Sequence, residues 1–296
     1  MIGRHIQPEA KHSRQHQYLS TFAVRMAIAL VLCLIGYVFL AYLVLPGYWQ
    51  HYEHQPGLRG RLMTTVTAQG IPGDPLNIGL VGSKADVVDA WRSAGWYPAD
   101  AITLTTSVEI VDSVLFDKPD PEAPVSNLFY DGRHQDLAFE KPVGSSADQC
   151  HHVRLWKILG SGVEHRPVWL ASATFDRGVG ISHYTGQITH HIAPDIDAER
   201  GLAMEELTQA GMLTEIYQVS GVGLTVSGRN GGGDSYFTDG EITIGVIRPD
   251  AVSFPALPKK LSSPTHIELK NSIWLAIRKF LGWRLVRSSA RARLPC

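Results

Sequence analysis

Cysteine is scarce in this sequence, and so is the support that disulfides would give a fold. The 296 residues include three cysteines, Cys33, Cys150 and Cys296. Three cannot form the network of bridges that holds small secreted domains together. A single Cys150–Cys296 bridge in an oxidising compartment is a minor alternative. With 44% hydrophobic residues, the chain is expected to fold around an apolar core instead.

The sequence also lacks the short motifs that mark three common kinds of catalytic site. It has no His-Glu-x-x-His pair of metal ligands. The glycine-rich GRNGGGD (228–234) lacks the Gly-Lys-Ser/Thr of a phosphate-binding loop, so we expect a hairpin tip there. GVGISHYTG (178–186) has no Gly-x-Ser-x-Gly elbow around Ser182. The most recognisable forms of metalloprotease, nucleotide-binding protein and serine hydrolase are therefore excluded.

Positive charge is scarce in the body of the chain. Residues 63–258 carry 12 Lys+Arg against 25 Asp+Glu, a net charge of −13, whereas residues 259–296 carry nine Lys+Arg against Glu268 alone, a net charge of +8. Binding to nucleic acid needs clustered cations that neutralise phosphates. The acidic body therefore argues against nucleic acid as a partner.

One stretch has no charge at all: MAIALVLCLIGYVFLAYLVL, residues 26–45. A helix of this length covers about 30 Å, the thickness of the hydrocarbon layer of a bilayer. The apolar part of a cleavable signal peptide would be shorter and would end in small residues, whereas bulky side chains close this one. Tyr48 and Trp49 fit an aromatic belt at the exit, and Pro46 is expected to end the helix. We predict one uncleaved transmembrane helix over residues 26–45.

The cations that flank this helix predict its direction. Four precede it and two follow within twenty residues: Arg4, Lys11, Arg14 and Arg25 before, Arg59 and Arg61 after. Segments rich in Lys and Arg stay in the cytoplasm. Residues 1–25 are therefore predicted to be cytoplasmic, with the main domain on the other side. The predicted location is a bacterial inner membrane, with that domain periplasmic or external.

The remaining residues predict one domain with a linker on each side. Residues 46–75, rich in His, Gly and Pro, are expected to be a tether, and 76–250 the domain. Residues 251–265 are expected to be a Pro-rich linker, and 266–296 a basic amphipathic tail.

Within the domain, local signals predict an α+β fold. Ser83, with Asp86 three residues later, predicts a capped helix in SKADVVDAWRSAGW, and DIDAERGLAMEELTQAG (195–211) predicts another with an Asp cap. A further helix is expected over residues 104–115. Strands are expected around residues 128–130, 137–140, 151–158, 168–175, 187–192, 213–221 and 240–247. This order predicts a single domain built on a mostly antiparallel sheet with two or three helices.

Several phrases in this domain resemble a known family. GIPGDPLNIGLVGS, APVSNLFYDGRHQDLAFE, HHVRLW and ITHHIAPDIDAER follow one another as in the LssY-like C-terminal domain family, over residues of about 60–250. In many members the domain follows a DedA-like or lipid-phosphate-phosphatase membrane domain. The resemblance implies here a stand-alone form with one short anchor. It implies no catalytic residue, and the chain lacks the Pro-Ser-Gly-His stretch of the lipid phosphatase.

Two pairs of adjacent histidines stand on extended segments, in QCHHVRLW (149–156) and ITHHIAPDID (188–197). Side chains alternate across a strand, so only one histidine of each pair can face a given site. This limits any shared site to two of the four histidines.

Neighbouring residues predict which two. In the first strand Val153 and Leu155 mark the core side. His152 and Arg154 are therefore expected on the other side. In the second strand two isoleucines share the side of His190, which leaves His191 on the more polar side. His152 and His191, rather than His151 and His190, are predicted to line any shared site.

Three interpretations of this cluster stay open. With Asp195 or Asp197, His152 and His191 could hold a divalent metal ion, or Arg154 could clamp a phosphate. Alternatively, these side chains form a structural network, and one aspartate caps the helix. True catalysis is the third and weakest interpretation. The structural network is favoured, because no chelating spacing is present.

Asp136 and Glu140 are secondary candidates. Four residues apart in RHQDLAFE, they share a face in either a strand or a helix. A solvated or salt-bridged face explains them better than acid–base chemistry does.

The tail has helical spacing, with tryptophans on an apolar side and cations around it. The residues expected at a membrane interface are Trp274, Arg278, Lys279, Phe280, Trp283 and Arg284. The alternative is a terminal helix packed on the acidic body. The first is favoured, because prolines separate the tail from the domain.

The sequence as a whole favours a membrane-anchored accessory or binding module of the cell envelope. Its expected partners are membrane phospholipid and proteins of the envelope or of a membrane complex. The competing interpretation is a metal- or Arg-assisted hydrolase acting on a phosphorylated or lipid-linked envelope substrate.

Overall fold

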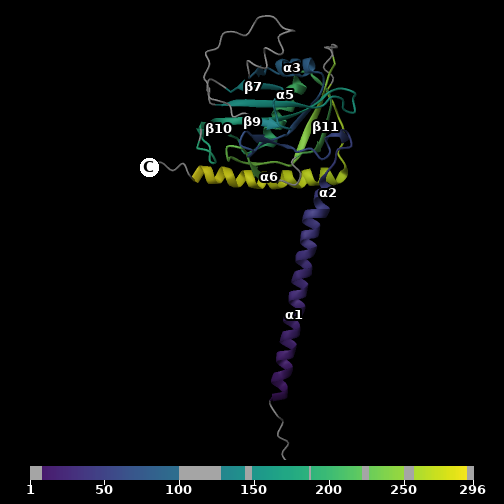
Figure 1. Ribbon diagram of the computed structural model, residues 1–296, viewed down its shortest axis with the longest axis vertical. Helices are drawn as coiled ribbons and strands as arrows, with labels where there is room; N and C mark the ends of the chain where they lie inside the picture. Colours follow the sequence, from purple (N-terminus) through teal and green to yellow (C-terminus); the bar gives the residue numbers. More distant parts are fainter. Residues whose placement is uncertain are drawn as a thin grey trace, which may run out of the picture. The chain divides into compact units, whose positions relative to one another are not determined.

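The computed structural model divides into two compact units, Met1–Tyr48 and Trp49–Cys296 (Figure 1). The residues it describes are 9–99, 128–143, 149–186, 188–221, 227–249 and 257–291. The helix expected over residues 104–115 and Cys296 lie outside them.

The first unit is one long helical stretch. α1 (Glu9–Phe39) continues through a π-helical turn, η1 (Leu40–Val44), into α2 (Leu45–Trp49). Residues Thr21–Trp49, which include the predicted 26–45, are long and apolar enough to cross a membrane. The helix does not end at Pro46 as expected; after the π-helical turn η1 it continues as α2 to Trp49.

A large mixed sheet is the centre of the second unit. Its strands are β3 (Ile78–Val81), β4 (Tyr97–Pro98), β7 (Leu137–Pro142), β8 (Cys150–Leu159), β9 (Val168–Ile181), β10 (Ile188–Ile192), β11 (Leu213–Ser220), β14 (Glu241–Ile247) and β15 (Lys259–Lys260). They run in the order β15-β11-β14-β3-β9-β8-β7-β4, and β10 pairs with β9. Only the β14/β3 and β11/β15 pairs are parallel. The predicted α+β class is confirmed, as are the seven predicted strands.

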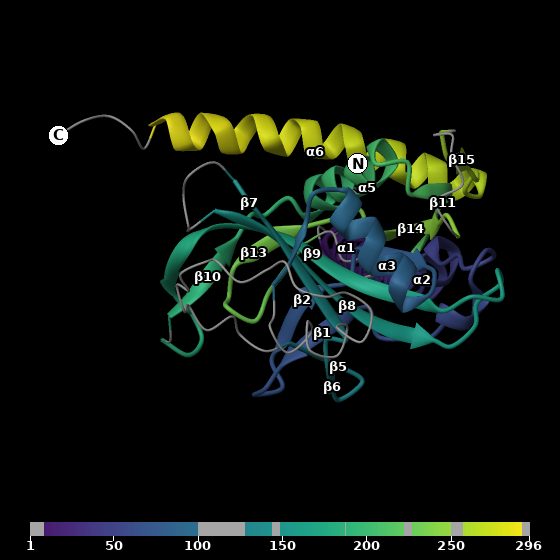
Figure 2. The same ribbon diagram turned by 90° about the horizontal axis from the view of Figure 1, so that it is seen from above.

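Two helices cover one side of this sheet (Figure 2). α3 (Lys84–Ser93) has the predicted capping box, in which Ser83 and Asp86 bond each other's backbone N–H. α5 (Ile196–Gln209) is capped by Asp195. Both helices pack apolar side chains on β8 and β9 in one core cluster, which contains Trp91 and Leu207.

The other side of the sheet is covered by the segment that was expected to be a tether. It contains η2 (Pro56–Leu58), β1 (Thr64–Thr67) and β2 (Pro72–Pro75), which join β5 (Leu128–Tyr130) and β6 (Arg133–His134) in a small sheet. Tyr52, Leu58 and Met63 are buried in a second core cluster. The prolines of β2 are tolerated because β2 is an edge strand. Only the beginning of residues 46–75 lies outside this unit.

The glycine-rich stretch forms the expected hairpin tip, between β12 (Ser227–Arg229) and β13 (Ser235–Phe237). Part of the expected Pro-rich linker is β15, which pairs with β11. The tail forms α6 (Thr265–Arg291), which runs along the domain (Figures 1 and 2) and contacts the start of α5 through Trp274 and Arg278.

Candidate functional site

The first histidine pair contributes to a cluster on the side of the sheet that faces away from α3 and α5. Nε2 of His152 lies 3.1 Å from Oδ2 of Asp176, and Nδ1 of His190 lies 3.3 Å from the same oxygen. The two imidazole rings are 6.2 Å apart. His152 and Asp176 are buried and His190 is mostly covered. The two histidines therefore share one carboxylate.

The pairing of the strands explains why His190, and not His191, belongs to this cluster. Ile192 is the register partner of Asp176, so the side of β10 that carries Ile192 and His190 is also the side of Asp176. Ile192 is buried on that side, but the side also carries Asp176, so the isoleucine did not separate an apolar side of the strand from a polar one. The prediction that His152 and His191 share a site is wrong for this reason.

Arg154 is paired inside the domain. Its Nη1 lies 3.8 Å from Oδ2 of Asp74 on β2, and both side chains are buried. Burial raises the pKa of Asp74; Arg154 and a hydrogen bond from Asn230 oppose the rise, and Asp176 and Asp234 add to it. Arg154 thus balances part of a group of carboxylates, and it is not an open anion clamp.

The other two histidines have carboxylate partners of their own. Nδ1 of His191 lies 2.8 Å from Oδ1 of Asp234, whose second oxygen accepts the backbone N–H of Ile192 at 3.1 Å. Nδ1 of His151 lies 2.8 Å from Oε1 of Glu199 on the α5 side of the sheet. All four histidines of the two pairs therefore contact a carboxylate.

Asp195 and Asp197 lie in a different part of the domain, at the start of α5. Oδ1 of Asp195 accepts the N–H of Ala198 at 3.0 Å. Oδ1 of Asp197 accepts the hydroxyl of Thr238 at 2.7 Å. The predicted set of His152, His191, Asp195 and Asp197 is not assembled into one metal site.

The secondary candidates also lie apart. Asp136 pairs with Arg133 at 3.2 Å and accepts the N–H of Lys157 at 2.7 Å, so its contacts are structural. Glu140 is the register partner of His152 on the neighbouring strand, and it belongs to the surroundings of the histidine cluster.

Asp74, Asp176, His190 and Asp234 were missed from the sequence. One signal was present for Asp176: Ser172, Thr174 and Asp176 alternate with apolar residues along β9, which marks a polar side of that strand. Asp74 and Asp234 come from distant segments, and no local pattern connects them with the histidines.

The start of α6 packs on the domain through a tryptophan. Trp274 is only 6% exposed, and its Nε1–H donates to Oδ2 of Asp197 at 3.1 Å. Its ring lies 6.5 Å from that of Phe237. Two turns earlier in the helix, Ile267 is fully buried. Trp274 was expected at a membrane interface, and that prediction is wrong. The side chain faces the domain because a buried carboxylate accepts its N–H.

Ion pairs on the same side of α6 also hold the helix on the domain. Lys270 contacts the fully buried carboxylate of Glu241, which also lies 2.8 Å from Nε2 of His51. Arg278 contacts Asp195. Arg278 was likewise expected at the membrane and instead pairs with the acidic body. Lys279 is exposed, and the side chains of Phe280, Trp283 and Arg284 lie outside the described part.

A neighbouring flank of α6, about 100° around the helix from the docked side, exposes aliphatic side chains. Leu269, Ile273 and Ile277 are 59%, 51% and 44% exposed. Their spacing of four residues places them in one stripe along the helix. We call these three residues the outer stripe of α6.

α6 begins beside Trp49, the first residue of the second unit. The ring of Trp49 lies 6.5 Å from the ring of His266. The backbone carbonyl of Trp49 accepts the hydroxyl of Ser220 at 2.8 Å, and the N–H of His51 donates to the same hydroxyl at 2.9 Å. The entry of the chain into the domain is thus fixed to β11 and lies next to α6.

Comparison with known families decides where this domain belongs. Residues 52–242 match the family described as LssY C-terminus, which is more than half of the chain. The chain belongs to the LssY C-terminus family. The matched segment contains the histidine cluster and the former tether from Tyr52 onward, whereas the apolar helix and α6 lie outside it. No curated protein and no solved structure matches the chain.

Proposed function

We propose that this protein is a membrane-anchored binding module of the bacterial cell envelope, whose LssY C-terminus domain rests on the bilayer surface through α6. The observation that carries the proposal is the outer stripe. Its three half-exposed aliphatic side chains lie on a helix whose polar and aromatic side is already bonded to the domain.

The position of α6 supports a bilayer as the surface that the stripe contacts. Trp49 follows the first unit directly in the chain and contacts His266 at the start of α6, so α6 is connected to the apolar helix through its immediate continuation in sequence. An interfacial helix places aliphatic side chains at the boundary between headgroups and acyl chains, with cations around them. The exposed Lys279 and the net charge of +8 in residues 259–296 fit an anionic surface.

The direction of the anchor follows from the sequence. Four cations before the apolar helix and two after it favour a cytoplasmic N-terminus and a periplasmic domain at the inner membrane. The Arg-assisted form of the hydrolase interpretation draws no support from the contacts of the domain, because Arg154, its anion clamp, is paired with Asp74.

The test uses the full chain in phospholipid nanodiscs with a nitroxide label on either of two neighbouring residues. Ile273→Cys places the label on the outer stripe, and Ser272→Cys places it about 100° away around the helix. Both variants also carry serine at the three native cysteine positions. The label at 273 should be reached by oxygen, which concentrates in lipid, and the label at 272 by a water-soluble nickel chelate. Equal access of the nickel chelate to both labels would contradict the proposal.

A further inference from the structure

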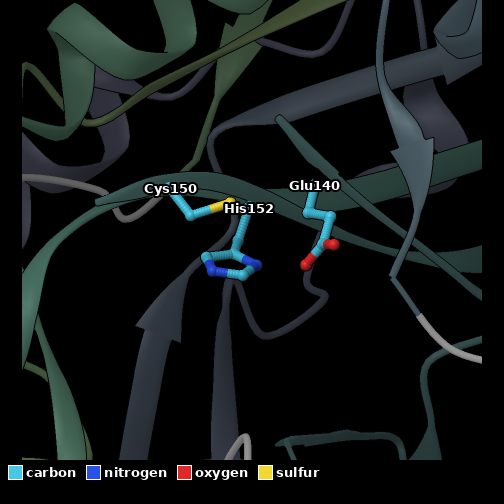
Figure 3. Close-up of side chains that lie close together, drawn as sticks. All are labelled: Glu140, Cys150 and His152. Carbon is cyan, nitrogen blue, oxygen red and sulfur yellow. The ribbon is translucent and has the colours of Figure 1, made fainter. Parts of the chain in front are cut away.

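Three potential metal ligands lie together on β7 and β8. Glu140 and His152 are register partners on the two strands, and Cys150 is two residues before His152 on the same side of β8. Each offers one ligand atom, and these atoms all lie within 4.8 Å of one another. Figure 3 shows the carboxylate of Glu140 facing the imidazole of His152, with the sulfur of Cys150 close to that ring.

Asp176 prepares the imidazole of His152 to bind a metal. Oδ2 of Asp176 lies 3.1 Å from Nε2, which favours a proton on that nitrogen. The lone pair then resides on Nδ1, the second nitrogen of the ring. Carboxylates hold metal-binding histidines in this way in many zinc sites, where they fix the tautomer and make the ligand more basic.

Burial and charge also fit a cation at this place. Cys150 and His152 are 9% and 8% exposed. Among the residues that the structure describes, the carboxylate of Glu140 has no hydrogen bond or ion pair, whereas its backbone pairs with β4 and β8. A neighbouring carboxylate opposes ionisation of a thiol unless a cation binds between the two groups. A divalent cation would stabilise both groups.

We propose that Glu140, Cys150 and His152 form a binding site for a zinc ion, with Asp176 as its outer support. The thiolate disfavours magnesium and calcium, which prefer oxygen ligands, whereas one sulfur, one nitrogen and one oxygen suit zinc. Bonds of about 2.0–2.3 Å to a tetrahedral ion separate the ligand atoms by roughly 3.3–3.8 Å, so small side-chain rotations would close the site. Three protein ligands leave the fourth position to water or to an exogenous ligand.

Cobalt(II) tests this site, because it replaces zinc and reports its ligands by its absorption. The full chain in detergent is reduced, stripped with a chelator and titrated with Co²⁺. One equivalent should bind, with the visible bands of a tetrahedral ion and a near-ultraviolet band from thiolate to cobalt. Zinc should displace it. No stoichiometric binding of either ion would refute the site.

Variants separate this site from other donors in the chain. Cys150→Ser should remove the thiolate band, and Glu140→Gln and His152→Ala should each weaken binding at least 10-fold. Asp176→Asn should weaken metal binding about 10–100-fold and keep the thiolate band, because Asp176 contacts a metal ligand and not the metal itself.

Cys33→Ser and His183→Ala are the controls. The second tests a neighbouring group of His183, His191 and Asp234, whose ligand atoms are equally close. A spectrum lost in His183→Ala and kept in Cys150→Ser would assign the metal to that group and overturn the proposal. Alkylation of the wild-type thiols gives a readout without any variant: Zn²⁺ should slow the labelling of Cys150, and unchanged labelling at saturating Zn²⁺ would also contradict the site.

Discussion

His152 on β8 and His190 on β10 contact the same oxygen of Asp176, which stands on β9 between them. β8 and β10 do not pair with each other, and β10 is bonded only to β9 among the strands of this sheet. The shared carboxylate therefore adds a side-chain connection across three strands, two of which have no backbone pairing with each other.

Removal of this carboxylate should destabilise the domain. In a chelator-containing buffer, Asp176→Ala should lower the free energy of unfolding by about 1–3 kcal/mol, because two mostly buried imidazoles lose their partner. Urea denaturation measures the difference. Asp89→Ala, at an exposed position on α3, is the control and should change stability by less than about 0.5 kcal/mol. Equal effects of the two substitutions would show that Asp176 contributes no more than a surface charge.

The attachment of α6 depends on one tryptophan. Trp274→Ala removes a buried ring and the hydrogen bond to Asp197, and should cost about 3 kcal/mol. Local opening of α6 should then become on the order of 100-fold more frequent, which hydrogen exchange of its backbone amides measures.

The neighbouring Leu275 is a matched control for this experiment. It is 51% exposed, so Leu275→Ala removes a side chain from the same helix without breaking a contact of this kind. Its exchange rates should stay close to those of the wild type. If the two variants open equally, α6 is held by its ion pairs alone.

Local signals in the sequence were sufficient to predict α3 and α5. Ser83 and Asp86 are three residues apart, and the contact between them needs nothing beyond the first turn of α3. The polar candidates differ in this respect, since they meet only through strand pairing. The alternation of side chains along a strand correctly predicted that two adjacent histidines do not share one site. The choice between His190 and His191 depends on the register of β10 with Asp176 on β9, which no local pattern contains.

The former tether and the tail were misjudged for a related reason. Gly and Pro near β1 and β2 indicated a loose linker, yet Tyr52, Leu58 and Met63 are apolar side chains with a core to fill. Trp274 has the spacing of an interfacial residue, and only the distant Asp197 makes it a docking residue. In both cases the deciding partner is far away in sequence.

The cap of α3 should make stability depend on pH in a defined direction. Burial works to raise the pKa of Asp86, but hydrogen bonds from Arg166 and Ser83 outweigh it, and the pKa is lowered overall. A carboxyl group with a lowered folded-state pKa stabilises the fold above its unfolded pKa of about 3.9. This stabilisation is lost as the pH falls from there through the lowered value.

Asp86→Asn tests this dependence. At pH 7 the variant should be about 1 kcal/mol less stable than the wild type, as expected for a weakened helix cap. The difference should shrink below about pH 4, because the wild-type carboxyl then also becomes neutral. Chemical denaturation of both proteins at several pH values measures it. A difference that is constant from pH 7 to pH 3 would mean that the charge of Asp86 does not contribute.

The direction of the anchor can be tested with reporter enzymes in bacterial cells. A reporter that is active only in the periplasm should be active when fused after Cys296, and a reporter that is active only in the cytoplasm should be inactive there, because four cations precede the apolar helix and two follow it. Replacing Arg14 and Arg25 by glutamine makes the two counts equal and should yield a mixture of both orientations. Cytoplasmic activity of the wild-type fusion would reverse the proposed topology and, with it, the periplasmic location of the domain.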